Sequence, residues 1–401
     1  MVDQETYAIR QRLDQASLWK GRGPLLGHLD MELTERCNNN CVHCYINLPA
    51  DDPTVRENEL STGEIKEILK EAASLGCLTV RLTGGEPLLR EDFEEIYVFA
   101  RGLGIKVLLF TNATLITPDI AALLARIPCL EKIEITVYGM NKRSYEAVTR
   151  VPGSYEAAWR GINLLLKQNI PFVAKGVLLS SNREEMNEFE KWAATVPWMD
   201  GHPSYSMFLD LRCRRDAEEK NRVIKKLRLS VEEVLQVLKG RGERYIREMR
   251  EFCPRFIGPP DDMLFTCGAG VGGGCVDAYG HFQACMLLRH PDTVYDLKNG
   301  SLKHAMTDFI PKVRAMKASD PGYLTRCARC FLKGLCEQCP AKSWMEHGSL
   351  DTPVEYLCEI AHAQARYLGL LEEGEMAWEV KDWKERIKRF SGEEPVFNKE
   401  D

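Results

Sequence analysis

Short apolar runs alternate with amphipathic segments from His28 to about Leu211, and this alternation constrains the fold more than any other feature of the sequence. The runs are 29–33, 77–82, 106–110, 132–137, 172–179 and 204–209. Runs of this length are typical of buried strands, and the longer segments between them are typical of helices. Six βα units in series predict an α/β fold with a parallel sheet, closed or partly closed into a barrel.

Helix start signals support this interpretation at two of the intervening segments. Ser61-Thr-Gly-Glu64 is a capping box, which predicts the start of a helix. Gly76 follows the last apolar residue of that predicted helix. Thr117-Pro118 places a hydroxyl at the N-cap and a proline in the first turn. We therefore expect helices to begin at these two positions.

The unusual residues of this region follow the strands directly. In barrels of βα units, chemistry is built from the loops at the C-terminal ends of the strands. Those loops here read E-R-C-N-N-N-C-V-H-C-Y (35–45), T-G-G-E-P (83–87), T-N-A-T (111–114), T-V-Y-G (136–139) and S-S-N (180–182). We expect them to gather on one rim of the barrel.

Composition excludes several classes of function. The net charge of −6 gives no overall basic field for nucleic acid or an anionic membrane surface. No run reaches the roughly eighteen apolar residues of a membrane span, and the polar start has no signal-peptide core. We expect a cytoplasmic protein. Its fifteen cysteines are then reduced, and clustered reduced thiolates bind metal.

The first cysteine group resembles a known superfamily. Cys37-x3-Cys41-x2-Cys44 follows the first strand with an aromatic residue beside it, and Gly-Gly-Glu-Pro (84–87) follows the second. This combination resembles the radical S-adenosylmethionine (SAM) superfamily, in a partial (β/α)6 barrel. The resemblance implies that three catalytic thiolates hold a 4Fe-4S cluster and leave one iron open for SAM. It also implies cleavage of SAM to a 5'-deoxyadenosyl radical, which takes hydrogen from a substrate.

The resemblance also implies a set of SAM contacts. The Gly84 and Gly85 backbone and the Glu86 carboxylate would receive the methionine amino group. Asn112 and Thr136 would contact ribose or carboxylate, and Arg150 the carboxylate, unless Arg150 is a surface residue. The full set of expected cofactor-binding residues is Tyr45, Gly84, Gly85, Glu86, Pro87, Asn112, Thr136 and Arg150.

Eight cysteines crowd into residues 267–358. Structural zinc is one alternative, but zinc ribbons separate their C-x2-C pairs by about 15 to 20 residues, and here five residues intervene. Eight thiolates also suit two all-cysteine 4Fe-4S clusters. The pattern resembles the SPASM extension of radical enzymes, with twelve residues between Cys267 and Gly280 and a C-x2-C at 336–339 that is one residue shorter than usual.

The SPASM resemblance implies two auxiliary clusters that transfer electrons, making three clusters in all. One would be held by Cys267, Cys275, Cys285 and Cys339, and the other by Cys327, Cys330, Cys336 and Cys358. We therefore expect an N-terminal extension (1–27), a radical SAM partial barrel (28–211), a helical bridge (212–260), a small Cys-rich SPASM domain (261–365) and a C-terminal helical tail (366–401). In the tail, Met376, Val380, Trp383, Ile387 and Phe390 predict an apolar helical seam that packs on the core.

The resemblance favours oxidation or crosslinking of a ribosomally made peptide. Propionate decarboxylation of a tetrapyrrole and a non-enzymatic iron–sulfur electron carrier stay open as alternatives. The expected partners are the peptide, a separate leader-binding carrier protein, and an electron donor such as flavodoxin or ferredoxin. Arg-Cys-Arg-Arg (212–215) follows the sixth strand, and its guanidinium groups would suit acidic groups of a peptide or the propionates of a tetrapyrrole equally well. We expect Cys213 to be a small core residue; the alternative is a substrate contact, whose thiol pKa the arginines would lower if they face it.

Overall fold

The six expected strands form one parallel run in a computed structural model that describes residues 25–256 and 261–392. The strands are β1 (His28–Thr34), β4 (Thr79–Gly84), β5 (Lys106–Thr111), β6 (Leu130–Val137), β7 (Phe172–Val177) and β8 (Ser204–Ser206). Each pairs in parallel with the next, which confirms the predicted α/β partial barrel. A separate small pair, β2 (Arg36–Cys37) and β3 (Leu48–Pro49), flanks the cysteine loop.

The cysteine-rich region extends the same sheet. Strand β9 (Gly273–Val276) pairs in parallel with β1, and β10 (His281–Gln283) and β11 (Val294–Asp296) follow in antiparallel order. The resulting nine-stranded order is β11-β10-β9-β1-β4-β5-β6-β7-β8. These strands were not expected, because runs of three or four residues are too short to show a period.

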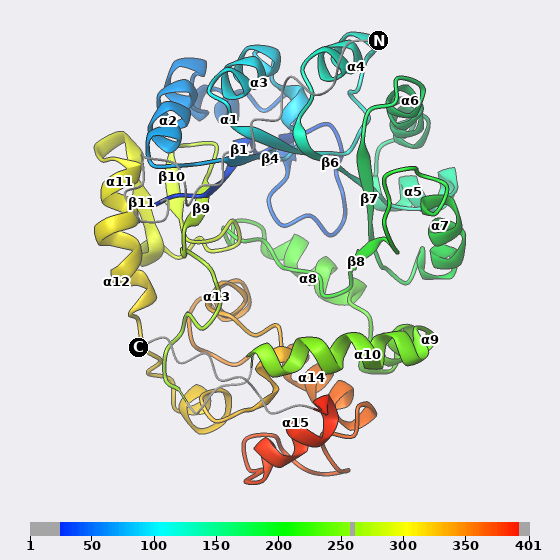
Figure 1. Cartoon of the computed structure of the whole chain (residues 1–401), viewed down its shortest axis with the longest axis vertical. Helices are drawn as coiled ribbons and strands as arrows, with labels where there is room; N and C mark the ends of the chain where they lie inside the picture. Colours follow the sequence, from blue (N-terminus) through cyan, green and yellow to red (C-terminus); the bar gives the residue numbers. More distant parts are fainter. Residues whose placement is uncertain (1–24, 257–260, 393–401) are drawn as a thin grey trace.

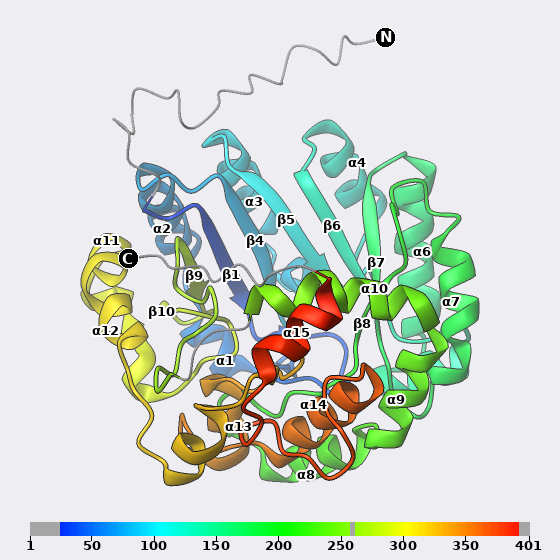
Figure 2. The ribbon, with the colours of Figure 1, turned by 60° about the horizontal axis from the view of Figure 1, so that its bottom comes forward.

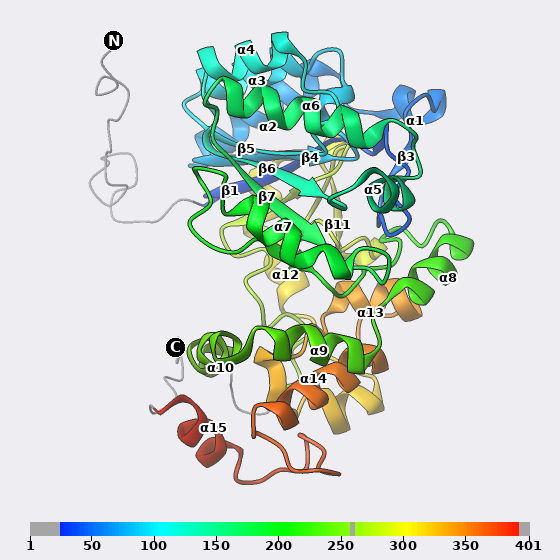
Figure 3. The same ribbon diagram turned by 90° about the vertical axis from the view of Figure 1, so that its right-hand side faces the viewer.

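The helices lie on both sides of this sheet (Figures 1 and 3). Those interleaved with the barrel strands are α1 (Pro53–Asn58), α2 (Thr62–Ser74), α3 (Phe93–Gly102), α4 (Pro118–Arg126), α5 (Lys142–Thr149), α6 (Ser154–Lys167) and α7 (Met186–Ala193). The rest are α8 (Glu218–Leu227), α9 (Val231–Gly240), α10 (Gly242–Phe252), α11 (Leu302–His304), α12 (Ile310–Arg314), α13 (Pro340–His347), α14 (Glu355–Tyr367) and α15 (Trp383–Ser391). Every helix within the described ranges is too short or too polar to cross a bilayer.

Both predicted helix starts are confirmed. Ser61 and Glu64 make the two reciprocal bonds of a capping box at α2, and the Thr117 hydroxyl accepts from the Ile120 N–H at α4. The tail differs from the prediction: only Trp383–Ser391 is helical. Gly369 and Gly374 have positive φ angles of 73° and 82°, so the chain turns before the seam can begin a helix. Val380, Trp383, Ile387 and Phe390 of the seam still pack into an apolar cluster with α9, α10 and α14.

The two faces of the sheet differ in polarity. Leu29, Met31, Val80 and Leu82 are buried in the apolar core that also contains residues of α2 and α3. The inner face instead carries two ion pairs, Asp30–Arg81 and Glu134–Lys175. The Arg81 and Lys175 cations both lie against the Phe110 ring, at 4.7 and 4.8 Å from its centroid. Because parallel sheets are ordinarily apolar on both faces, the inner face is built for a polar occupant.

Helix α6 approaches the β5 loop through Gly161. A Cβ at this position would lie 2.1 Å from the carbonyl oxygen of Ala113. We predict that Gly161→Ala lowers the free energy of unfolding by about 1–3 kcal/mol, because the backbone must shift to admit the methyl group. The measurement is urea unfolding of both proteins.

Gly102→Ala is the matched control. Gly102 ends α3, and an added Cβ would meet nothing within 4 Å. Alanine there should leave stability unchanged or raise it by up to about 1 kcal/mol. Equal effects of the two substitutions would contradict the close approach of α6 to the loop.

Candidate active site

The loop after β1 brings its three cysteines together. The Asn39 N–H donates to Cys37 Sγ at 3.4 Å, and the Asn47 N–H donates to Cys44 Sγ at 3.3 Å. Burial raises the pKa of Cys41 to about 12, with a further contribution from the nearby Cys44. Burial also raises the pKa of Cys37, which interacts with both other thiols. The three thiols of the predicted triad therefore interact electrostatically, and backbone N–H groups donate to two of them.

The donor set of this loop fits an iron–sulfur cluster with bound SAM. Both polar ends of the buried Asn39 side chain and Nδ1 of His43 lack a hydrogen-bond partner. Orphaned buried polar atoms are rare and indicate a site for a bound group. Among the described residues, no three His, Cys, Asp or Glu side chains converge as ligands of one metal ion. A cubane holds its thiolates at separate corners and does not require such convergence.

The Gly-Gly-Glu-Pro loop packs directly on the strand that leads into the cysteine loop. A Cβ at Gly84 would lie 2.0 Å from the Thr34 carbonyl oxygen, and one at Gly85 would lie 2.1 Å from that of Arg36. The Gly85 N–H donates to Thr34 O at 2.7 Å. The glycines therefore permit a backbone-to-backbone approach, which fixes this loop beside the cysteines.

Glu86 is fully buried and joins the ends of β4 and β5. Its carboxylate accepts from the Thr111 hydroxyl (2.8 Å), the Asn112 N–H (2.8 Å) and the Leu88 N–H (3.2 Å). Burial raises the pKa of Glu86 to about 7 despite these bonds. The carboxylate is thus oriented by protein donors before any ligand is considered. Pro87, also buried, begins the short turn that leaves the site.

Asn112 links the β5 loop to the first cysteine. Its Nδ2 donates to Asn38 Oδ1 at 3.0 Å and lies 3.8 Å from Cys37 Sγ, while its Oδ1 accepts from the Thr114 N–H at 2.9 Å. The T-N-A-T rim segment thus contacts the cysteine loop. Asn38 and Thr114 were not singled out from the sequence, because single polar loop residues carry no signal by themselves.

The other expected SAM contacts have different surroundings. Tyr45 donates from its hydroxyl to Met286 Sδ at 3.5 Å and so joins the cysteine loop to the cysteine-rich region. Thr136 is half-buried near the end of β6, opposite Lys175 on β7. Arg150 ends α5 in a left-handed conformation with an exposed side chain, which fits the surface alternative.

Two further residues interact with the first cysteine group, and neither was predicted as a site residue from the sequence. The Tyr138 side chain interacts with the Cys41 thiol and opposes the rise in its pKa. Lys220, on α8, interacts electrostatically with Cys44 and Cys41 and bonds to Asn47 Oδ1. Tyr138 lies in the T-V-Y-G rim segment and could have been included. Lys220 comes from a helix of the bridge whose approach only the fold reveals.

In Arg-Cys-Arg-Arg (212–215), the structure agrees with Cys213 as a core residue and not with the alternative of a substrate-facing thiol. Cys213 is fully buried, and burial raises its thiol pKa to about 12 rather than lowering it. The three guanidinium groups are all bound within the protein. Arg212 pairs with Asp216, Arg214 with Glu35 and Asp277, and Arg215 with the carbonyls of Trp344 and Met345. Flanking arginines point toward separate partners here, so they neither activate the thiol nor remain for a substrate.

The cysteine-rich region divides its thiols into two groups. Burial raises the pKa of Cys336, and Cys330, Cys327 and Cys358 raise it further. We name these four the C-terminal cysteine group. In the remaining set, Cys339 interacts with Cys285, and Cys285 with Cys267.

Cys275 stands apart from that second set. It is fully buried on β9, and its strongest electrostatic neighbours are Glu32 and Arg289. Glu32 and Arg289 form a buried ion pair on the inner side of β1, with Glu32 Oε1 and Arg289 Nε lacking partners. The sequence prediction nevertheless joins Cys275 to Cys267, Cys285 and Cys339, and we name these four predicted ligands the sheet-side cysteine group.

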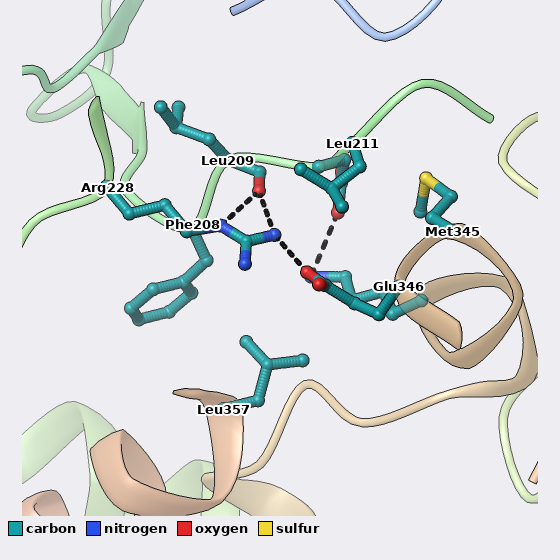
Figure 4. Close-up of a pocket in the computed structure, with 9 residues that line it drawn as sticks. Phe208, Leu209, Leu211, Arg228, Met345, Glu346 and Leu357 are labelled. Carbon is teal, nitrogen blue, oxygen red and sulfur yellow. Dashed lines mark hydrogen bonds and ion pairs between the residues drawn. The ribbon is translucent and has the colours of Figure 1, made fainter. Parts of the chain in front are cut away.

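Charged side chains around a small pocket connect α13 to the segment after β8 (Figure 4). The N-cap of α13 is Cys339. Arg228 donates twice to the Leu209 carbonyl oxygen, at 3.0 and 2.8 Å, and pairs with Glu346 at 2.5 Å. Lys342 lies 3.4 Å from Asp210. Because these charges satisfy one another, the pocket acts as a junction that positions Cys339.

Comparisons with known proteins agree with this architecture. Residues 31–193 match the family described as the radical SAM superfamily. The AdoMet-dependent heme synthase of Methanosarcina barkeri is 36% identical over 157 residues, which cover 39% of this chain and 44% of the relative. The mycofactocin maturase MftC of Mycolicibacterium smegmatis is 29% identical over 267 residues, covering 65% of this chain and 64% of the relative. Each alignment thus spans less than two thirds of the relative's length.

A solved structure shares the fold over most of the chain. Native anSMEcpe with bound AdoMet and the Cp18Cys peptide superposes with a TM-score of 0.60 at 15% identity, covering 86% of this chain and 97% of that chain. At this identity the likeness concerns the fold. The residues that match the radical SAM superfamily, 31–193, include both the cysteine loop and the Gly-Gly-Glu-Pro loop.

Proposed function

We propose that the chain is a radical SAM enzyme with a SPASM-type region that oxidises or crosslinks a ribosomally made peptide. Cys37, Cys41 and Cys44 would hold the catalytic cluster, and the C-terminal and sheet-side cysteine groups would hold two auxiliary clusters. When bound, the catalytic cluster and SAM supply a 5'-deoxyadenosyl radical. The remaining chemistry, which is positioning the substrate C–H and excluding water, belongs to the protein.

The chain's own residues would divide this work. The Gly84–Gly85 backbone and Glu86 would receive the methionine amino group, since their loop lies against the residues that lead into the cysteine loop. Asn112 and Asn38 would hold Cys37 in register with that loop. The orphaned Asn39 and His43 side chains would contact the bound cofactor. Thr136, Tyr45 and Pro87 would complete the wall of the site.

The neutral inner face of the sheet supports a peptide as the proposed substrate. Its ion pairs Asp30–Arg81 and Glu134–Lys175 cancel in charge, and the arginines after β8 are bound internally. A tetrapyrrole with several propionates needs unpaired cations, whereas a peptide presents mixed polar groups. These observations favour a peptide, with flavodoxin or ferredoxin as electron donor and a separate carrier protein for any leader.

Removing the first cysteine group should abolish radical formation. We predict that Cys37→Ala/Cys41→Ala/Cys44→Ala loses about four irons per chain and all release of 5'-deoxyadenosine from SAM and reductant. Iron analysis and chromatography after anaerobic reconstitution measure both. Cys77→Ala, which removes a buried thiol outside every group, should keep both properties. Continued SAM cleavage by the triple variant would refute the assignment.

Removing part of the C-terminal cysteine group should separate radical formation from product formation. We predict about twelve irons in the intact protein and about eight in Cys327→Ala/Cys330→Ala, with 5'-deoxyadenosine still released. Loss of one zinc in place of about four irons would make this group a structural metal site. Intact clusters without any SAM cleavage would support the electron-carrier alternative.

The substrate class is tested by two probes on the same reconstituted protein. A small peptide encoded beside this gene should raise 5'-deoxyadenosine release and emerge lighter by a pair of hydrogen atoms in mass spectrometry. Iron-coproporphyrin should leave the release unchanged. Decarboxylation of the porphyrin would replace the peptide proposal by the tetrapyrrole alternative.

A further inference from the structure

One cationic side chain reaches the C-terminal cysteine group directly. Arg326 lies in the turn Tyr323–Cys327, one residue before Cys327, and its Nη2 donates to Cys358 Sγ at 3.5 Å. The same guanidinium pairs with both carboxylate oxygens of Glu355, at 2.6 and 2.8 Å. Glu355 and Cys358 lie one turn apart on α14, so Arg326 ties the segment of Cys327 to the helix of Cys358.

The C-terminal tail holds this guanidinium in place. Arg326 lies 4.9 Å from the ring centroid of Trp378, which also packs at 5.2 Å against the ring of His362. With Glu355 at its edge and Trp378 on its face, the guanidinium has little freedom to turn away from the sulfur. Residues 377–378 therefore help to hold the donor groups beside Cys358, in addition to the apolar packing of the tail.

A second donor approaches the same sulfur. His362 Nε2 accepts from the Ala377 N–H at 3.1 Å, so in the neutral ring the proton resides on Nδ1. That Nδ1 lies 2.8 Å from the Cys358 carbonyl oxygen and 3.6 Å from Cys358 Sγ. Of the four thiols in its group, Cys358 is the one that Arg326 and His362 surround with donors.

We propose that Arg326 is a positioning residue whose hydrogen bond to Cys358 Sγ favours the reduced form of the cluster at the C-terminal cysteine group. Hydrogen bonds to cluster sulfurs and nearby positive charge stabilise the added electron, and so raise the reduction potential. The inference rests on the proposed function, since it requires an iron–sulfur cluster at this group.

The consequence is a direction for electron transfer. A peptide radical that becomes a closed-shell product loses one electron, together with a proton to solvent. By raising the potential at the C-terminal group, Arg326 would favour transfer of that electron from the sheet-side group to the C-terminal group. The electron then leaves to a one-electron carrier of the flavodoxin or ferredoxin class, which returns the cluster to its oxidised form.

The test is a redox titration of the anaerobically reconstituted full chain, followed by electron paramagnetic resonance. We predict that Arg326→Gln lowers the equilibrium constant for reduction of one cluster by about tenfold, because a charged hydrogen bond is lost. This change corresponds to a potential about 59 mV more negative for a one-electron couple. The other two clusters should keep their potentials.

Two controls separate the hydrogen bond from other effects. Arg329→Gln removes an exposed cation beside Cys330 and should leave the potential unchanged. Glu355→Gln breaks the ion pair but keeps the donor, so it should shift the potential by less than Arg326→Gln. Equal shifts in Arg326→Gln and either control would overturn the proposal, as would no shift in Arg326→Gln.

Cluster content distinguishes failure of this inference from failure of the proposed function. About four irons in the intact protein, with zinc in place of the rest, would remove the cluster itself. If the Arg326→Gln protein loses iron, the titration is made on Arg326→Lys instead. Lysine keeps the positive charge but lacks the planar, forked set of N–H donors of a guanidinium. A smaller shift in the same direction is then expected, and an unchanged potential in that variant overturns the inference.

Discussion

The backbone contact between the loop after β4 and the C-terminal end of β1 is the constraint on which the rest of the site depends. Gly84 and Gly85 allow the loop after β4 to lie against Thr34 and Arg36, where any side chain would collide with a carbonyl oxygen. This contact fixes the Glu86 carboxylate, which in turn holds Thr111 and the Asn112 N–H. Asn112 then reaches Cys37 and Asn38. Three loops from separate βα units are thereby joined before a cofactor arrives.

A second layer of contacts connects this rim to the cysteine-rich region. Tyr45 meets Met286, Arg214 joins Glu35 to Asp277, and Glu32 pairs with Arg289 across β1. The partners in each pair lie far apart in sequence. Charges buried in this way are costly unless paired, so each bond also specifies one arrangement of the two regions. The site is therefore shared between the barrel and the residues that follow it.

Sequence patterns predicted the barrel strands and helix starts because these depend on local period and capping. They predicted the cysteine loop and the Gly-Gly-Glu-Pro loop because residue type and spacing are unusual there. They did not predict β9–β11, whose strands are too short to show a period, or the approach of Lys220, which is set by the bridge. The arginines at 212–215 show the same limit. Sequence neighbours shared a charge, but the buried partners of Arg214 at Glu35 and Asp277 depend on tertiary packing.

The pairing of β9 with β1 has a consequence for how the protein is made. Strand β1 receives β4 on one side soon after synthesis, but its other edge waits for Gly273–Val276. A nascent chain therefore carries an unpaired strand edge, with the first cysteine loop at its end, through most of its translation. Closure of that edge by β9 also brings Cys275 into the sheet. Completion of the sheet and burial of this late cysteine are thus the same folding event.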